Sequence, residues 1–396
     1  MKIVLLNWRN GENDPFTYFN QCLKDAFEQL GRPTRIIDID QAFSHNLHEA
    51  HSEGIDFVFT WQGLGSGAGS DHMKSTTLWD DLKIPLVCYH GDHPCHMPGN
   101  HKAMSPWIRH VYAVASFASF ANAYIPRGHG AIAVQPPIWF PNAIHHRFNG
   151  DYFVVAKNLD DNEIVFSRWR NAPQRRTAAF LAEAASAIIS EVGGGNRTNH
   201  HRIIEQMLSP AAIGSLSDEL NGAPELMVRM HIHGLLDKVY RNTLAEHVVA
   251  ELADVPLKIY GRGWERFKAQ ANPKHEFLSF DSMSDNAFQY ASNYGILDVA
   301  PTNDSLHDRT LRAMANGAGF LIGSRWPDEL LLGKPHDALL FDSSPDSLRC
   351  RAQAVMKSPE THREACRDFA RQYRTHFSIY DFLKVLESVA RSIYSS

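Results

Sequence analysis

Residues 294–324, YGILDVAPTNDSLHDRTLRAMANGAGFLIGS, combine four local patterns in a short span. The apolar runs at its two ends are typical of short buried strands. Between them, a polar loop over 302–308 precedes a helical pattern over 309–316 that ends at the NGAG turn. A strand, loop, helix and strand in this order form the repeating unit of a parallel α/β sheet.

The start of this predicted helix carries positive charge. Arg309 and Arg312 lie where helices prefer carboxylates, because the unpaired N–H groups of the first turn already give that end a partial positive charge. We expect Ser305 or Asp308 to cap the helix. Such a helix start binds anions, and the forked guanidinium of Arg309 suits a phosphate. The alternative is that both arginines are solvated surface residues.

The same alternation of strands and helices runs along the rest of the chain. The first half has short apolar runs at 2–8, 33–40, 55–61, 84–90 and 110–116. The second half has further runs at 152–158, 256–260, 294–299, 319–323 and 337–342, and 359–396 is almost entirely helical in pattern. This alternation predicts an α/β fold with parallel sheets covered by helices on both faces.

A proline-rich segment divides the chain. Residues 133–151, AVQPPIWFPNAIHHRFNGD, lack a periodic pattern and are typical of an interdomain linker. With 396 residues, the chain is also longer than one hydrophobic core usually serves. We predict a Rossmann-like domain over 1–140, a second over 151–375 with a helical insertion at about 168–252, and a terminal helix over 376–396.

Composition argues against several classes of protein. The net charge of −5 gives no support for a nucleic-acid partner. The five cysteines are odd in number and scattered, unlike a disulfide framework. The apolar run at the N-terminus is too short for a signal peptide or a transmembrane segment. We therefore expect a cytoplasmic protein without a transmembrane segment.

Histidine is unusually frequent, with 22 residues. The segment CYHGDHPCHMPGNH, 88–101, combines cysteine and histidine, as zinc sites do. It lacks a CxxC pair, however, and adjacent residues of a strand point to opposite faces, so we expect no metal there. The HH at 200–201 and the HIH at 231–233 fall in the predicted insertion and are expected to face solvent.

Asp92 and His93 follow the predicted strand at 84–90. Ligands of parallel sheets bind at the carboxyl ends of strands, so either side chain is a candidate to accept a proton from a hydroxyl group. The alternative is that Asp92, His93 and Pro94 form a turn that caps the next segment.

Two glycine-containing loops follow other predicted strands. The first, 62–71, could hold a sugar or phosphate through backbone N–H groups, although mobility is the simpler interpretation. Its candidate residues are Trp61, Gln62 and Gly63. The second, IYGRGW at 259–264, has Gly261, which lets the backbone approach a ligand, and Arg262, which could reach forward to it. A tight turn is the alternative there.

Four segments, in chain order, carry distinctive motifs. IPLVCYHGDHP (84–94) is a strand with a D-x-P turn, and AYIPRGHGAIAVQPP (123–137) leads into a proline-rich linker. VYRNTLAEHVVAELADVPLKIYGRGW (239–264) is an Arg-containing helix before a strand that ends in YG-x-GW. In 293–322, an arginine precedes an RAMANG helix. This series resembles the GT-B glycosyltransferases, specifically the group related to the spore-maturation protein CgeB.

The resemblance implies two Rossmann-like α/β domains that face a central cleft. Such an enzyme moves a sugar from a nucleotide-sugar donor to a hydroxyl acceptor in a glycan, small molecule or protein. The first domain would bind the acceptor, and the terminal helix would cross back to it. In the second domain, Gly261 and Arg262 would flank the nucleotide, and Arg309 would meet the donor diphosphate. The remaining donor-side candidates are Asn303, Ser305, His307, Asp308 and Arg312.

One position departs from the family pattern. Many retaining GT-B enzymes carry a glutamate, in EAMA, that binds the donor ribose; the matching residue here is Arg312, and the earlier acidic position is Asp304. Arg312 would select a differently charged donor or turn away from the site. We therefore expect inversion, with Asp92 or His93 as general base and with no metal or other cofactor. A catalytically inactive nucleotide- or glycan-binding protein is the alternative, and a hydrolysing epimerase on this fold is a third option.

Overall fold

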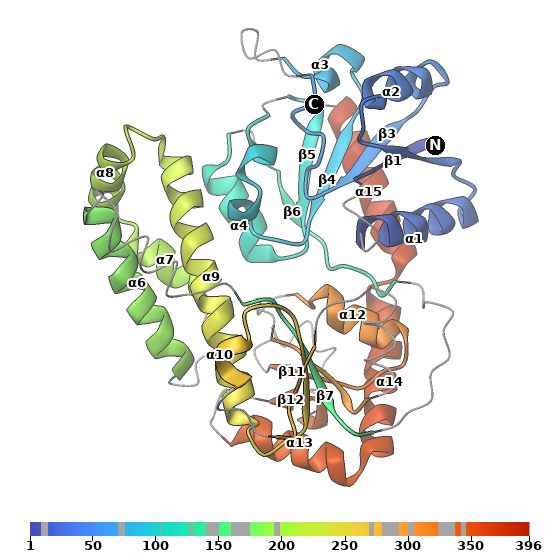
Figure 1. The fold of residues 1–396 in the computed structure, drawn as a ribbon. Helices are drawn as coiled ribbons and strands as arrows, with labels where there is room; N and C mark the ends of the chain where they lie inside the picture. The colour runs from blue at the N-terminus through green and yellow to red at the C-terminus, as the bar shows by residue number, and fades with distance from the viewer. Residues whose placement is uncertain are drawn as a thin grey trace. The chain divides into compact units, whose positions relative to one another are not determined.

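The chain forms two compact units (Figure 1). Unit 1 comprises Met1–Phe140 and Arg374–Ser396, and unit 2 comprises Pro141–Tyr373. The computed structural model describes residues 1–8, 15–69, 76–103, 105–126, 130–139, 150–159, 175–193, 199–268, 273–278, 293–299, 305–323, 337–341 and 346–395. Within these residues, each unit contains one sheet of six strands, all paired in parallel.

The sheet of unit 1 has the strand order β2-β1-β3-β4-β5-β6. Its strands are β1 (Ile3–Asn7), β2 (Thr34–Asp38), β3 (Phe57–Trp61), β4 (Leu86–His90), β5 (Ile108–Tyr112) and β6 (Ile132–Ala133). Every residue of β1, β3 and β4 is buried, which is typical of a parallel sheet covered on both faces.

The helices of unit 1 come from both ends of the chain. They are α1 (Pro15–Gln29), α2 (Phe43–Ser52), α3 (Leu78–Leu82), α4 (Ala115–Tyr124) and α15 (Ile379–Tyr394), with 3-10 turns η1 (Pro94–His96) and η2 (Pro98–His101). The terminal helix α15 packs on β4, where the rings of Tyr89 and Phe382 lie 5.0 Å apart. Arg32 Nε also donates to Glu387 Oε1 at 2.9 Å. These contacts attach the end of the chain to unit 1.

The sheet of unit 2 has the order β12-β11-β10-β7-β8-β9. Its strands are β7 (Phe153–Ala156), β8 (Leu257–Tyr260), β9 (Glu276–Leu278), β10 (Gly295–Leu297), β11 (Phe320–Gly323) and β12 (Leu340–Phe341). Several helical elements accompany them: α10 (Glu265–Lys268), α12 (Asp308–Ala315), η3 (Asp337–Leu339), α13 (Ser347–Lys357) and α14 (Pro359–His376).

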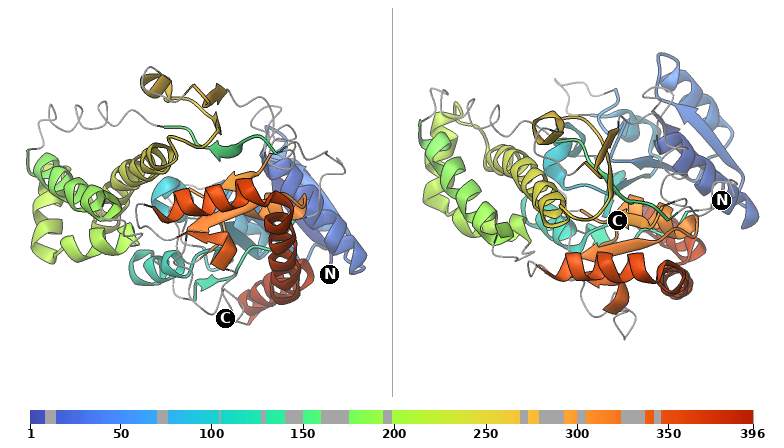
Figure 2. Two further views of the ribbon diagram at one scale, coloured as in Figure 1. Left: turned by 90° about the horizontal axis from the view of Figure 1, so that it is seen from below. Right: turned by 60° about the horizontal axis from the view of Figure 1, so that its bottom comes forward.

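Within the described residues of unit 2, a group of four helices precedes β8. They are α6 (Arg175–Gly193), α7 (His200–Met207), α8 (Pro210–Glu219) and α9 (Glu225–Glu251). The first three pack against α9, whose apolar residues share a core with β7 and β8. Figure 2 shows these helices from two further directions.

Our expectation of solvent exposure is wrong for three histidines in this group: His200, His201 and His233 are buried. They lie between α7 and α9, where their rings pair with carboxylates. His200 Nε2 lies 2.7 Å from Asp237 Oδ1, and His233 Nε2 lies 2.6 Å from Glu205 Oε1. Because α9 is covered by three helices, its polar side chains need partners inside the group.

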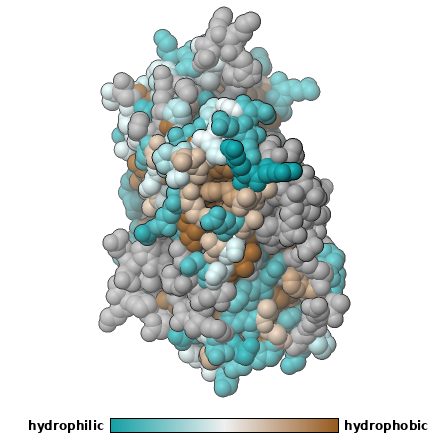
Figure 3. All heavy atoms as spheres, turned by 90° about the vertical axis from the view of Figure 1, so that its left-hand side faces the viewer, coloured by the Kyte–Doolittle hydropathy of each residue, from teal (hydrophilic) through white to brown (hydrophobic). Residues whose placement is uncertain are grey.

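The surface of the described residues is mixed in character. Figure 3, in which the side of Figure 1 with α6 and α8 faces the viewer, shows hydrophobic residues among hydrophilic ones. Ile189 on α6 is one of the large hydrophobic side chains exposed to solvent. In the part of the chain that the structure describes, no helix combines the length and apolar character needed to cross a membrane.

His362 on α14 predicts a loss of stability in mild acid. Burial lowers the pKa of its imidazole to about 4. A hydrogen bond with the Phe320 backbone opposes this shift, and the charge of Arg363 adds to it. The unfolded chain binds this proton near pH 6.5, so the free energy of unfolding falls by up to roughly 3 kcal/mol between pH 6.5 and 4. We expect His362→Gln to flatten the pH dependence of urea denaturation in this window. An unchanged slope would contradict this assignment.

Candidate functional site

The strand order of unit 2 points to one edge of its sheet. Counted from its own first strand, the order is 3-2-1-4-5-6, because the chain builds β8 and β9 on one side of β7 and then crosses to β10 on the other. Ligands of such doubly wound sheets bind at the carboxyl ends of the strands beside this reversal. The candidate site in unit 2 is therefore formed by the residues that follow β7, β8 and β10.

The glycines after β8 serve a close contact between two chain segments. Gly261 has φ +133°, and a Cβ atom there would lie 2.2 Å from the carbonyl oxygen of Lys157, just after β7. A Cβ atom on Gly263 would lie equally close, at 2.2 Å, to the oxygen of Leu159. The Leu159 N–H donates to the Arg262 oxygen at 2.8 Å. The turn therefore fixes the strand ends and presents the exposed Arg262 side chain.

This close approach predicts a large cost for Gly261→Ala. The new methyl group meets the backbone of Lys157 rather than a movable side chain. We expect the free energy of unfolding to fall by about 3 kcal/mol, from the positive φ and the overlap together. Gly222→Ala is the control, since Gly222 has φ +73° with nothing within 4 Å, and we expect a loss of about 1 kcal/mol. Equal losses in urea denaturation would contradict the role of the contact.

A buried hydrogen bond fixes α12 to the end of β10. Thr310 Oγ1 donates to Asp298 Oδ2 at 2.9 Å, and both residues are buried. Asp298 follows directly on β10, and Leu311 in the next position of the helix is also buried. No local sequence pattern indicated this pair. Its effect is to hold the first turn of α12 at the carboxyl edge of the sheet.

The N-cap of α12 differs from our expectation. His307, rather than Ser305 or Asp308, occupies this position, with φ −70° and ψ 149°. Its Nδ1 lies 3.3 Å from the Arg309 backbone nitrogen. Ser305 lies two residues earlier and is buried. Asp308 is the first residue of the helix, and its carboxylate contacts other side chains.

Asp308 and Arg312 form an ion pair across one turn of α12. Arg312 Nη2 donates to Asp308 Oδ2 at 2.9 Å, and His307 Nδ1 lies 2.5 Å from the other carboxylate oxygen. Burial raises the pKa of Asp308, but the charges of His307 and Arg312 outweigh it and hold this pKa well below its usual range. The carboxylate is therefore ionised at neutral pH, and its charge balances that of the buried Arg312.

Arg309 is the other arginine at the start of α12. Within the described residues, its guanidinium makes no hydrogen bond or ion pair, and its side chain is partly exposed. The first-turn N–H groups of α12 add a partial positive charge of about half a unit. Because Asp308 is balanced by Arg312, the described residues of the helix start carry a net positive charge, which suits a phosphate.

The structure brings most donor-side candidates together. Ser305, His307, Asp308, Arg309 and Arg312 lie on or beside the first turns of α12. Gly261 and Arg262 follow β8, which only β7 separates from β10, a distance of roughly 10 Å between strand axes. Asn303 lies outside the described residues.

In unit 1, the strand order reverses between β1 and β3, and Trp61 ends β3. Its side chain is buried, and its Nε1 donates to Asn20 Oδ1 at 2.8 Å. The indole packs in an aromatic cluster with Phe16, Phe19, Phe59, Tyr89 and Trp139. The packed indole of Trp61 therefore fixes the start of the loop that follows β3.

A hydrogen bond links the loops after β3 and β4. Gln62 Nε2 donates to Asp92 Oδ2 at 2.9 Å and so orients the carboxylate. Gln62 and Gly63 both have positive φ, 53° and 69°, and Asn100 Nδ2 donates to the Gln62 oxygen at 2.8 Å. Gln62, Gly63 and the half-buried Asp92 thus lie together at the carboxyl edge of the unit 1 sheet.

His93 caps the 3-10 turn η1. Its Nδ1 accepts a hydrogen bond from the Cys95 N–H at 3.2 Å, and its ring is buried against Phe117 and Phe120. This is the capping role considered as the alternative in the sequence. Asp92 is the more accessible of the two side chains.

Solved structures identify the fold. The chain is similar to the T4 phage protein BGT, crystallised in complex with its UDP-glucose substrate, with a TM-score of 0.53 and 10% identity over 97% of this chain and 98% of that one. It is also similar to sucrose-phosphate synthase from Thermosynechococcus elongatus, with a TM-score of 0.52 and 10% identity over 100% and 99% of the two chains. The fold is GT-B, as predicted from the sequence.

Residues 241–383 match a protein family described as Glycosyl transferase-like. This segment, about a third of the chain, includes β8, β10, α12 and β11, and with them the candidate site of unit 2. No curated protein matches the sequence.

Proposed function

We propose that the protein is a glycosyltransferase that moves a sugar from a nucleotide-sugar donor to a hydroxyl acceptor. The observation that carries this proposal is Arg309 at the start of α12, at the reversal of the unit 2 sheet, whose guanidinium makes no hydrogen bond or ion pair within the described residues. This helix lies within the segment that matches the glycosyl transferase-like family. The GT-B protein BGT was crystallised with UDP-glucose, a donor of the same chemical class.

In the proposed reaction, unit 2 stabilises the leaving group. The bond between the anomeric carbon and the donor diphosphate breaks, and negative charge builds up on the departing nucleoside diphosphate. Arg309 and the first-turn N–H groups of α12 would meet this charge. Because the chain supplies this positive charge itself, we propose that transfer needs no metal ion and no other cofactor.

Unit 1 would activate the acceptor. As the acceptor oxygen bonds to the anomeric carbon, its proton passes to the Asp92 carboxylate, which Gln62 orients. A single displacement of this kind inverts the anomeric configuration. Inversion is supported by Arg312, which occupies the position of the ribose-binding glutamate of many retaining enzymes and is directed to Asp308. The acceptor is a hydroxyl group of a glycan, a small molecule or a protein.

We place the protein near the CgeB-related group of GT-B enzymes. The support is the sequence of 239–264 and 293–322, where the YG-x-GW turn and the arginine before the helix lie at the candidate donor site. The odd number and scattered positions of the five cysteines support a reducing compartment, and we propose the cytoplasm.

Arg309→Ala tests the proposed role of this arginine in donor binding. We expect kcat/KM for transfer to fall about 100- to 1000-fold, the usual cost of removing one donor to a developing anion, with no change in thermal stability. Arg371→Ala on α14 is the matched control, because its side chain is 75% exposed and we expect no effect. Release of nucleoside diphosphate from a panel of nucleotide sugars and hydroxyl acceptors is the measurement. Full activity of Arg309→Ala would overturn the assignment.

A second candidate function is a GT-B-like protein that binds a nucleotide or glycan without turnover. The observation that favours it is Arg312, a cation where a ribose-binding carboxylate is expected by resemblance. Thermal stabilisation by a nucleotide sugar, with no product from any acceptor of the panel, would support this function over transfer.

Asp92→Asn separates the two proposed bases. The amide oxygen of asparagine can still accept the hydrogen bond from Gln62, so the loop should keep its conformation. We expect kcat to fall about 100- to 10,000-fold while the affinity for the nucleotide sugar stays unchanged. For His93→Gln we expect lower thermal stability, because this ring caps η1. Unchanged kcat in Asp92→Asn would exclude Asp92 as the base.

A further inference from the structure

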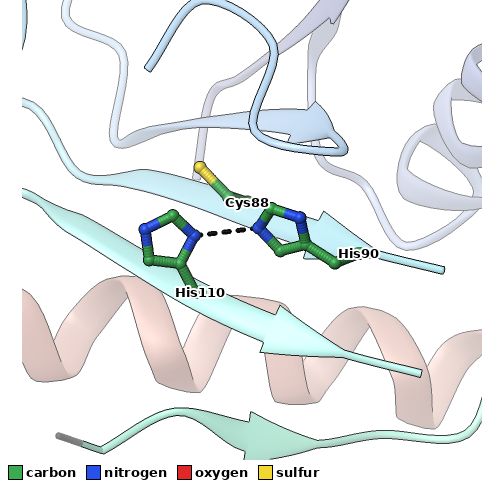
Figure 4. Close-up of side chains that lie close together, drawn as sticks. All are labelled: Cys88, His90 and His110. Atoms are coloured by element: carbon green, nitrogen blue, oxygen red, sulfur yellow. Dashed lines mark hydrogen bonds between the residues drawn. The ribbon is translucent and has the colours of Figure 1, made fainter. Parts of the chain in front are cut away.

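Cys88, His90 and His110 converge on one face of the unit 1 sheet (Figure 4). Cys88 and His90 lie two residues apart on β4, so their side chains point to the same face. The register of β4 and β5 places His110 directly opposite Cys88. His90 Nε2 and His110 Nδ1 are 2.8 Å apart, and one potential ligand atom from each of the three residues lies within 4.8 Å of the others.

This cluster is enclosed by the protein. All three side chains are buried, and Cys88 also packs against the apolar core of unit 1. A third imidazole, His101 at the end of η2, lies beside them, with ring centroids 4.6 Å from His90 and 4.9 Å from His110. Burying several polar rings in this way costs free energy unless they gain strong partners.

The donor set is the one that zinc prefers. Thiolate and imidazole ligands bind zinc at about 2.3 Å and 2.0 Å, which places tetrahedral ligand atoms roughly 3.3–3.6 Å apart. His90 Nε2 and His110 Nδ1 lie 2.8 Å apart, and the ligand atoms of all three residues lie within 4.8 Å of one another, so small side-chain rotations would bring them to these separations.

We propose that Cys88, His90 and His110 bind a zinc-class divalent ion inside unit 1, with His101 as the fourth ligand. On binding, the Cys88 thiol releases its proton to solvent. The hydrogen bond between His90 and His110 is exchanged for two nitrogen–metal bonds, and the ring that donated this hydrogen bond adopts its other tautomer. The proposal departs from our expectation of no metal in 88–101, because His110 lies outside that segment.

The ion would hold the acceptor-side loops in place. His90 is the last residue of β4, two positions before Asp92, and a Cβ atom on Gly63 would lie 3.1 Å from His90 Cε1. An ion that ties β4, β5 and η2 together therefore stabilises the segments from which the loops after β3 and β4 begin. It takes no part in the leaving-group chemistry proposed for unit 2, and the two proposals stand independently.

Cobalt titration of the full chain, purified without a histidine tag and freed of metal, tests the site. We expect one Co²⁺ per chain, with a thiolate-to-cobalt charge-transfer band, and displacement of Co²⁺ by an equivalent of Zn²⁺. Cys88→Ala should abolish the band and weaken binding at least about 100-fold, and His110→Gln should weaken it comparably. Cys366→Ala is the matched control, because it removes another buried thiol beside a histidine, 3.5 Å from His362 Nε2.

Two outcomes would overturn the proposal. One is a wild-type chain that binds no stoichiometric Co²⁺ or binds it without the thiolate band. The other is a band that persists in Cys88→Ala or disappears in Cys366→Ala. The wild-type spectrum decides the first point even where a variant fails to fold, and circular dichroism of each variant checks its fold. Zinc content measured in Arg309→Ala should equal that of the wild type, whatever its transfer activity.

Discussion

The ion pair between Asp308 and Arg312 decides which charge the start of α12 presents. Without it, a carboxylate in the first turn would counter the helix dipole and repel a phosphate. With Arg312 bound to Asp308, these two charges balance, and among the described residues of the helix start Arg309 supplies the remaining positive charge. Arg312 thus has an internal partner, which is one of the two possibilities that its position in the sequence left open.

The strand order of the unit 2 sheet then determines where this positive charge lies. The crossing of the chain from β9 to β10 puts α12 beside the reversal of the unit 2 sheet, and the hydrogen bond from Thr310 to Asp298 holds it there. The glycines after β8 let two strand ends pack closely on the other side of β7. In unit 1, the hydrogen bond from Gln62 to Asp92 joins two loops in an equivalent way. Each candidate site is therefore built on strand ends, with side chains held by hydrogen bonds.

The strand pattern was predictable because it is local. Apolar runs such as 84–90 and 256–260 indicated β4 and β8, and their alternation with helical patterns predicted the fold class that the structure confirms. Very short strands such as β6 escape detection, because two residues carry no period. Contacts between residues distant in sequence could not be predicted either. His110 joins Cys88 only through the β4–β5 register, and His200 is buried only because α7 packs on α9. His307 became the N-cap while Asp308 pairs with a residue one turn later.

A crystal structure with a nucleoside diphosphate bound tests most directly whether the start of α12 is the donor-diphosphate site. We expect the diphosphate within hydrogen-bond distance of the first-turn N–H groups of α12 and of the Arg309 guanidinium, with Arg312 still bound to Asp308. A diphosphate that binds away from α12, or that is held by Arg312 instead of Arg309, would contradict the assignment.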